Sequence, residues 1–145
     1  MFGERISDQF MKAEGHIPVL DENRIATHYS EGKSRPAYTV DGIYKKKPPE
    51  EGYIITEVKF RTGGDFGAEN LSMTKGNTYN GVTYPPAKQM SDKWILPRIE
   101  NDPWLTPEQI EDITKNYERW LIVVDENGKI TGPIKLDAFA NAINP

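Results

Sequence analysis

The fold of this chain is decided by two stretches of sequence, Tyr38-Thr-Val-Asp-Gly-Ile-Tyr44 and Tyr53-Ile-Ile-Thr-Glu-Val-Lys-Phe60. Both are rich in β-branched and aromatic residues, which are enriched in strands. A segment built around Pro48-Pro49-Glu-Glu-Gly52 separates them, and its proline and glycine residues favour a loop. We therefore expect two neighbouring antiparallel strands.

Three charged residues occupy these strands. Side chains alternate between the two faces of a strand, so Glu57 and Lys59 share one face with Ile55. Asp41 on the first strand adds a second carboxylate, and such a cluster costs free energy unless something binds within it. A divalent metal ion bridging Asp41 and Glu57, with Lys59 beside an attacking water, is one such arrangement. The alternative is a pair of exposed strand-end carboxylates in surface ion pairs, with Lys59 as one partner.

This arrangement resembles the PD-(D/E)XK nuclease superfamily, in which an Asp and then a Glu-x-Lys on the next strand carry metal-dependent phosphodiester hydrolysis. Further segments follow in the order of that resemblance: Gly3-Glu4, Asp41-Gly-Ile-Tyr44, Glu57-Val58-Lys59, Met73-Thr74-Lys75 and Lys88-Gln-Met-Ser-Asp-Lys-Trp-Ile95. The series is similar to the C-terminal nuclease domains of bacterial polymorphic toxins of the contact-dependent inhibition, Rhs and LXG types. It covers Gly3 to Asp137.

The resemblance implies a role for each residue of the motif. Asp41, Glu57 and the main-chain carbonyl of Val58 would bind Mg²⁺ or Mn²⁺. Lys59 would orient or deprotonate the attacking water and offset charge in the transition state.

Two further catalytic residues are implied by the resemblance. Glu4 on the first helix would reach the metal site; Glu14, at the other end of that helix, is the competing carboxylate, and stabilisation of the helix dipole is the structural alternative for Glu4. Gln89 would position the substrate or the nucleophile. Its structural alternative is a polar residue that caps a helix.

The composition limits which metals and partners are plausible. The chain has no cysteine and only two histidines, His16 and His28, so carboxylates must supply any metal ligands, and oxygen ligands favour magnesium or manganese. Its net charge of −4 argues against unspecific binding of nucleic acid. Local basic segments, Lys33-Ser-Arg35, Lys45-Lys-Lys47 and Arg61, could still guide a nucleic acid, although Lys45 to Lys47 would equally suit a solvated strand end. No stretch is apolar enough to cross a bilayer, so we expect no stable membrane association.

We expect residues 1–145 to form a single α+β domain, with a mixed central sheet flanked by helices. The resemblance implies a restriction-endonuclease-like core. Helices are predicted over Phe2–Glu14, over Gln89–Asn101 with Pro97 kinking or ending it, over Thr106–Asn116, and briefly after a capping Asp137. The segment between Lys75 and Lys88 departs from the shorter connection of the toxins; it could shape a substrate groove, bind an inhibitor or do neither.

The function implied by the resemblance is a metal-dependent endonuclease that acts as an antibacterial toxin. DNA is the favoured substrate, with RNA or transfer RNA as the alternative, and a cognate immunity protein is the expected partner. The domain would be secreted or delivered as part of a larger protein and act in the cytoplasm of the target cell. Two other functions remain open: a non-catalytic binding module with a nuclease-like fold, and an intracellular nuclease of DNA repair or restriction.

Overall fold

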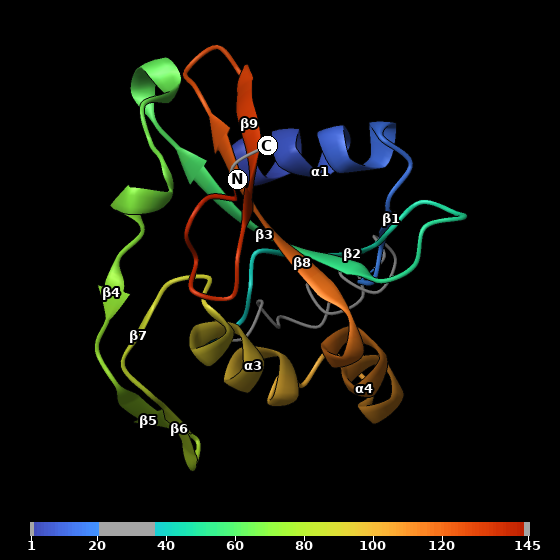
Figure 1. Ribbon diagram of the computed structural model, residues 1–145, viewed down its shortest axis with the longest axis vertical. Helices are drawn as coiled ribbons and strands as arrows, with labels where there is room; N and C mark the ends of the chain where they lie inside the picture. The colour runs from blue at the N-terminus through green and yellow to red at the C-terminus, as the bar shows by residue number, and fades with distance from the viewer. Residues whose placement is uncertain (1, 21–36, 144–145) are drawn as a thin grey trace.

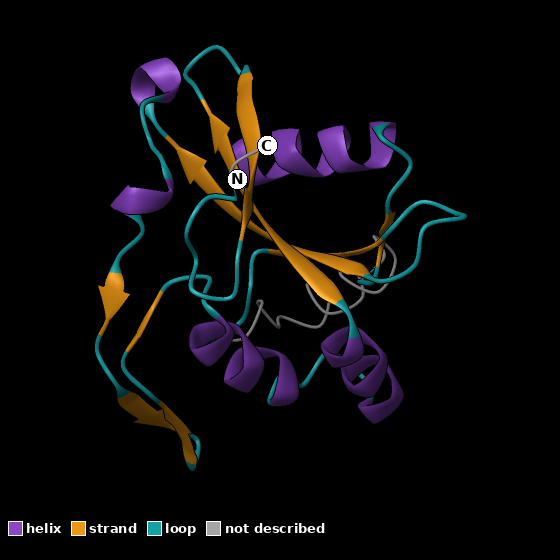
Figure 2. Cartoon of the chain, viewed as in Figure 1, coloured by secondary structure: helices purple, strands orange, loops and turns teal. Residues whose placement is uncertain are grey.

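The computed structural model describes residues 2–20 and 37–143 of the chain. Within this part the protein is a mixed α+β structure: a five-stranded mixed sheet, three α-helices and small hairpins (Figures 1 and 2). The order of strands across the sheet is β1 (Ile17–Pro18), β2 (Gly42–Lys45), β3 (Tyr53–Phe60), β8 (Tyr117–Val124) and β9 (Ile130–Leu136). None of the helices described is long and apolar enough to span a bilayer.

The two stretches that were expected to pair do so. β2 and β3 are antiparallel neighbours, with Gly42 opposite Thr56 and Lys45 opposite Tyr53. The first strand is shorter than predicted, because Tyr38 has a left-handed backbone with φ of 60° and regular pairing begins only at Gly42. Asp41 therefore lies immediately before β2, where the edge of β3 that faces β2 has no further strand partner.

Helices cover both faces of the sheet (Figure 1). α1 (Phe2–Ala13) covers one face, where Met11 packs in a cluster with Ile54 of β3 and Trp120 of β8. α3 (Asp92–Glu100) and α4 (Pro107–Lys115) cover the other, where Ile55 shares a second cluster. The helical members of that cluster include Trp94, Ile95, Ile99 and Ile113. Ile55 therefore points away from α1, and Glu57 and Lys59, at positions of the same parity, share its face, as predicted.

β3 and β8 pair in parallel, with Glu57 opposite Leu121, so a long connection must return the chain to the same end of the sheet. This connection contains two 3-10 turns, Thr62–Gly64 and Ala68–Asn70, followed by two short antiparallel pairs. β4 (Met73–Thr74) pairs with β7 (Ala87–Lys88), and β5 (Asn77–Tyr79) with β6 (Val82–Tyr84). The segment between Lys75 and Lys88 is thus mainly the β5–β6 hairpin.

One helix prediction was wrong in detail and one was wrong outright. α3 begins at Asp92 rather than Gln89, because Met90 has φ of 73°, which no right-handed helix tolerates. Pro97 lies inside α3 without ending it. The predicted final helix is absent from the described residues 137–143: the Asp137 carboxylate accepts hydrogen bonds from the amides of Phe139 and Asn141 and closes a turn instead.

The predicted start of α4 was confirmed. The amide of Gln109 donates to Thr106 Oγ1 at 3.1 Å, while the amide of Thr106 donates to Gln109 Oε1 at 2.9 Å. This reciprocal capping box satisfies two amides that the first turn of a helix would otherwise leave unpaired. The capping box therefore fixes where α4, the last element between β3 and β8, begins.

Candidate active site

Asp41 and Glu57 are in direct contact where β2 begins beside β3. Their side chains share a hydrogen bond, and Asp41 Oδ2 also accepts a hydrogen bond of 2.9 Å from the amide of Val58. In a strand, the N–H and C=O of one residue point to the same edge, so the Val58 carbonyl is also directed toward Asp41. Two carboxyl groups and one main-chain carbonyl therefore converge at this edge of β3.

Gly42 allows the two strands to approach closely beside this pair. A Cβ atom at position 42 would overlap the Oγ1 atom of Thr56 and lie 3.0 Å from the ring of Tyr44. Thr56 is almost completely buried, so it has little room to move. Any larger residue at position 42 would push β2 away from β3 and would separate Asp41 from Glu57.

Glu57 is a buried acid whose charge is poorly compensated. Glu57 is only 6% exposed. Burial, and to a smaller extent the neighbouring Asp41, raise the pKa of Glu57 to about 8, although Lys59 acts in the opposite direction. At neutral pH Glu57 is therefore mostly protonated, and this proton allows it to share a hydrogen bond with Asp41. A cation at this position would replace the proton.

Lys59 is the positive group nearest to this pair. Its Nζ atom lies 3.5 Å from Glu57 Oε2, and its side chain is 19% exposed. The Lys59 ammonium also lies 5.8 Å from the centre of the Phe66 ring, and Arg61 Cζ lies 4.9 Å from the same ring. Lys59 and Arg61 thus form a local basic cluster beside Glu57 in a chain that is acidic as a whole.

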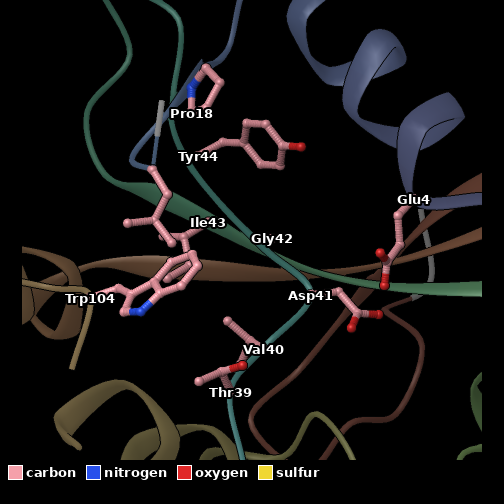
Figure 3. Close-up of a pocket in the computed structure, with 10 residues that line it drawn as sticks. Glu4, Pro18, Thr39, Val40, Asp41, Gly42, Ile43, Tyr44 and Trp104 are labelled. Carbon is pink, nitrogen blue, oxygen red and sulfur yellow. The ribbon is translucent and has the colours of Figure 1, made fainter. Parts of the chain in front are cut away.

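Glu4 of α1 lies on the other side of Asp41. Burial raises the pKa of Glu4, and the charge of Asp41 raises it further. Figure 3 shows the Glu4 side chain extending toward Asp41 across a cavity of about 250 Å³ that both residues line, with Trp104 on its far wall. Glu14 lies beyond the opposite end of α1, exposed, so the structure brings Glu4 and not Glu14 to the site.

The donor set suits a hard divalent cation that keeps part of its water shell. Among the described residues, no three acidic, histidine or cysteine side chains are close enough to form a metal site by themselves. Asp41, Glu57 and the Val58 carbonyl nevertheless offer oxygen ligands only, and Mg²⁺ is typically bound by one or two carboxylates and several waters. The raised pKa of Glu57 also fits a cation site. Burial and Asp41 disfavour the charge of Glu57, and Lys59 compensates it only in part.

Gln89 is the predicted site residue that the structure does not connect to the others. It lies in the turn between β7 and α3, where its amide donates to the carbonyl of Ser72 at 2.8 Å. No described hydrogen bond or ion pair links its side chain to Asp41, Glu57 or Lys59.

The predicted basic segments also differ in what they offer. Lys46 forms an ion pair with Glu118, so it is engaged within the fold. Lys33-Ser-Arg35 lies outside the described residues. Arg61 alone among the described basic residues of those segments contacts the surroundings of Lys59, through Phe66.

Sequence reasoning missed Arg98, which lies within electrostatic reach of Glu57. Arg98 as a whole residue is 7% exposed. Burial lowers the pKa of Arg98, and Glu57 acts against that shift. The available signal was its spacing, because Arg98 follows Trp94 by four residues and therefore occupies the buried stripe of α3.

Comparison of the chain with models of protein families, with curated proteins and with solved structures finds no match in any of the three. The interpretation of the site therefore rests on its own geometry and on the motif in the sequence.

Proposed function

We propose that this chain is a metal-dependent endonuclease of the PD-(D/E)XK type, with a restriction-endonuclease-like core. The observation that carries the proposal is the contact between the Asp41 and Glu57 carboxyl groups at the start of β2, with Lys59 Nζ 3.5 Å from Glu57 on the same face of β3. The motif requires an Asp and a Glu-x-Lys on neighbouring strands, and β2 and β3 are such neighbours. The position of Glu4 beside Asp41 adds support.

The residues divide the chemistry of phosphodiester hydrolysis between them. Asp41, Glu57 and the Val58 carbonyl would hold Mg²⁺ or Mn²⁺, which when bound supplies charge neutralisation at the phosphate and a more acidic water. Glu57 has to lose its proton before it can act as a ligand, because metal ligands bind in their deprotonated form. The Lys59 ammonium, close to Glu57, orients the water and stabilises negative charge that develops on the phosphate oxygens.

The proposal extends to the biological role. DNA is the favoured substrate and RNA or transfer RNA the alternative, and the domain acts as an antibacterial toxin that a cognate immunity protein neutralises. The resemblance of the sequence to toxin nuclease domains supports this role. The local basic cluster of Lys59 and Arg61 supports contact with a phosphate backbone in spite of the net charge of −4.

Expression of the chain inside bacteria tests the proposal. Wild-type protein should stop growth and degrade the nucleoid, or deplete an RNA, whereas Asp41→Ala should be tolerated. Glu111→Ala serves as the matched control, because Glu111 is an exposed acid whose one described ion pair is with Lys115 on the same helix. Equal toxicity of wild type and Asp41→Ala would contradict the proposal, and harmless wild-type protein would favour a binding module.

Metal binding is a separate readout for the same site. In calorimetric titrations with Mn²⁺, Asp41→Ala and Glu57→Ala should lose most of the binding that wild type shows. Glu111→Ala should bind as wild type does. Unchanged binding in both site variants would remove the metal from this position.

A further inference from the structure

Three tyrosine rings form a cluster at the base of the β5–β6 hairpin. The ring of Tyr38 is stacked on that of Tyr84, with centroids 4.6 Å apart and an interplanar angle of 17°. The centroid of the Tyr79 ring lies 5.1 Å from that of Tyr38. Tyr84 is buried, whereas Tyr79 is 42% exposed. The cluster therefore contains one buried ring, that of Tyr84, and one exposed ring, that of Tyr79.

The cluster is fixed in place by the backbone and by a hydrogen bond. Tyr38 has φ of 60°, a conformation that is rare for a bulky residue and that persists only where the surroundings impose it. The side-chain amide of Asn77 donates to the Tyr38 hydroxyl, which ties the hairpin to this residue. Tyr38 precedes Asp41 by only three residues, so the tyrosine cluster and the catalytic carboxylate are held by one short segment.

Arg98 of α3 packs against the rings of the tyrosine cluster and of Trp94. Its Cζ atom lies 4.0 Å from the centre of the Trp94 ring, 5.2 Å from that of Tyr84 and 5.6 Å from that of Tyr38. Arg98 Nη1 donates to the Trp94 carbonyl at 2.9 Å. The charge of Glu57 also opposes the lowering of the Arg98 pKa that burial causes, so Arg98 interacts with both the rings and this carboxyl group.

A cavity of about 220 Å³ opens beside the exposed ring. Its lining includes the rings of Tyr79 and Tyr84 together with Asn80 and Asn101. Aromatic walls bind the flat face of a nucleobase, and asparagine side chains can donate to and accept from a base edge. The cavity thus combines the two kinds of contact by which proteins hold an unpaired base.

The charge of the protein makes such a contact important. A nucleic-acid-binding protein usually gains most of its affinity from lysine and arginine contacts to phosphates, and this chain carries a net charge of −4. Stacking of a base on an aromatic side chain does not depend on net charge and strengthens binding by about 5- to 150-fold per base. In a duplex the faces of a base are covered by its neighbours, so only an unpaired base can stack on a tyrosine.

We propose that the cavity lined by Tyr79 and Tyr84 binds an unpaired nucleobase of the bound strand, so that the substrate is single-stranded or locally unpaired nucleic acid. This inference rests on the proposed nuclease function and specifies its substrate class. Tyr79 provides the stacking face, and Arg98 and Tyr38 hold the cavity at a fixed position relative to Asp41 and Glu57.

Fluorescence anisotropy with labelled oligonucleotides tests the inference. The protein carries Asp41→Asn and is kept in EDTA, so that the probe stays intact and the repulsion between carboxylate and phosphate is reduced. The probes are a 12-nucleotide DNA strand, an RNA strand of the same sequence and the corresponding blunt DNA duplex. At least one single strand should bind about tenfold more tightly than the duplex, and the stronger of the two identifies the sugar that the site prefers.

Variants of Tyr79 separate stacking from general stability. Tyr79→Ala should weaken binding of the preferred strand about tenfold, whereas Tyr79→Phe, which keeps the ring, should stay within about twofold of the parent. Circular dichroism should show the same fold for all three proteins. Equal binding of duplex and single strands, or equal binding by Tyr79→Ala and Tyr79→Phe, would overturn the inference.

The outcomes also separate this inference from the proposed function. Metal-dependent cleavage of duplex DNA with no effect of Tyr79→Ala would leave the nuclease in place and remove the base pocket. Ring-dependent binding of a single strand by a protein that neither binds metal nor cleaves would support the pocket and remove the nuclease.

Discussion

Glu57 and Glu118 lie on adjacent strands of the same sheet, but their surroundings shift their pKa values in opposite directions. Around Glu118, Lys46 forms an ion pair, Trp120 Nε1 donates at 3.3 Å and Lys135 Nζ lies 3.9 Å away. Burial alone would raise the pKa of Glu118, but these partners outweigh it and the pKa is lowered. Around Glu57 the nearest groups are one lysine and another carboxyl group, and the pKa is raised to about 8.

The difference separates a carboxylate whose charge the chain compensates from one whose charge it compensates poorly. Glu118 has partners for both of its oxygens within the chain, so its ionised form is favoured on folding. Glu57 is ionised only at a cost, which a bound cation would remove. A buried acid paired with another acid is therefore stronger evidence for a binding site than the Glu-x-Lys motif by itself.

The largest expected effect is on cleavage and would test this contrast most severely. Glu57→Gln keeps the shape of the side chain but removes the proposed metal ligand, so we expect cleavage of nucleic acid to fall about 1,000-fold. Glu118→Gln should stay within about twofold of wild type, because Glu118 lies outside the site. Initial rates on plasmid DNA and on total RNA with Mg²⁺ measure both. Similar losses in the two variants would mean that the contrast has no functional meaning.

Replacement of Lys59 should have the next largest effect. Lys59→Ala removes a group that positions water and stabilises charge, and such a loss typically reduces the rate about 100-fold. Mn²⁺ affinity measured by calorimetry should be largely retained, since Lys59 is not a ligand. Lys115→Ala, at an exposed lysine on α4 whose one described ion pair is with Glu111, is the matched control. If Lys59→Ala cleaves as fast as wild type, Lys59 only forms an ion pair with Glu57 and takes no part in the reaction.

The smallest expected effect is on stability, and it has opposite signs for the two acids. The folded-state pKa of Glu57 is about 8 against an ordinary 4.5, so without metal its stabilisation is complete below pH 4.5 and is lost as the pH rises toward 8. One such group can change the free energy of unfolding by at most about 1.4 kcal/mol per pH unit, and we expect this free energy to fall by about 2 kcal/mol in total. The lowered pKa of Glu118 gives stability above pH 4.5 that is lost as the pH falls further.

Urea unfolding in EDTA at several pH values measures this effect. Glu57→Gln should remove the fall between pH 4.5 and 8, and Glu118→Gln should leave that fall but weaken the loss at lower pH. Saturating Mn²⁺ should also remove the fall in wild type, because the ion takes the place of the proton on Glu57. A wild-type protein whose stability rises steadily from pH 4.5 to 8 without metal would contradict the assignment.

Local patterns predicted the parts of this fold that depend on local physics. The alternation of β3 placed Glu57 and Lys59 on one face, and the Thr106-Pro107 start of α4 forms the expected capping box. The neighbouring positions of β2 and β3 also followed from composition and the short loop between them.

The parts that failed depend on conformations or contacts that local patterns do not specify. Met90 adopts a left-handed conformation that shortens α3, and the Asp137 carboxylate closes a turn where a helix was expected. Arg98 could not be assigned because its surroundings, Tyr38 and Tyr84, come from segments distant in sequence. Gln89 was carried over from a resemblance, and the structure gives its side chain no described contact with the carboxylates.

The parallel pairing of β3 with β8 determines when the site can form during synthesis of the chain. Glu57 lies opposite Leu121, so β3 emerges from the ribosome long before the strand that completes its second edge. Non-local parallel pairings form late because the intervening loop must close first. While residues up to about Val124 are still being translated, the sheet that holds Asp41 and Glu57 together lacks a central strand. We therefore expect Asp41 and Glu57 to reach their final arrangement only after β8 has been synthesised and has paired with β3.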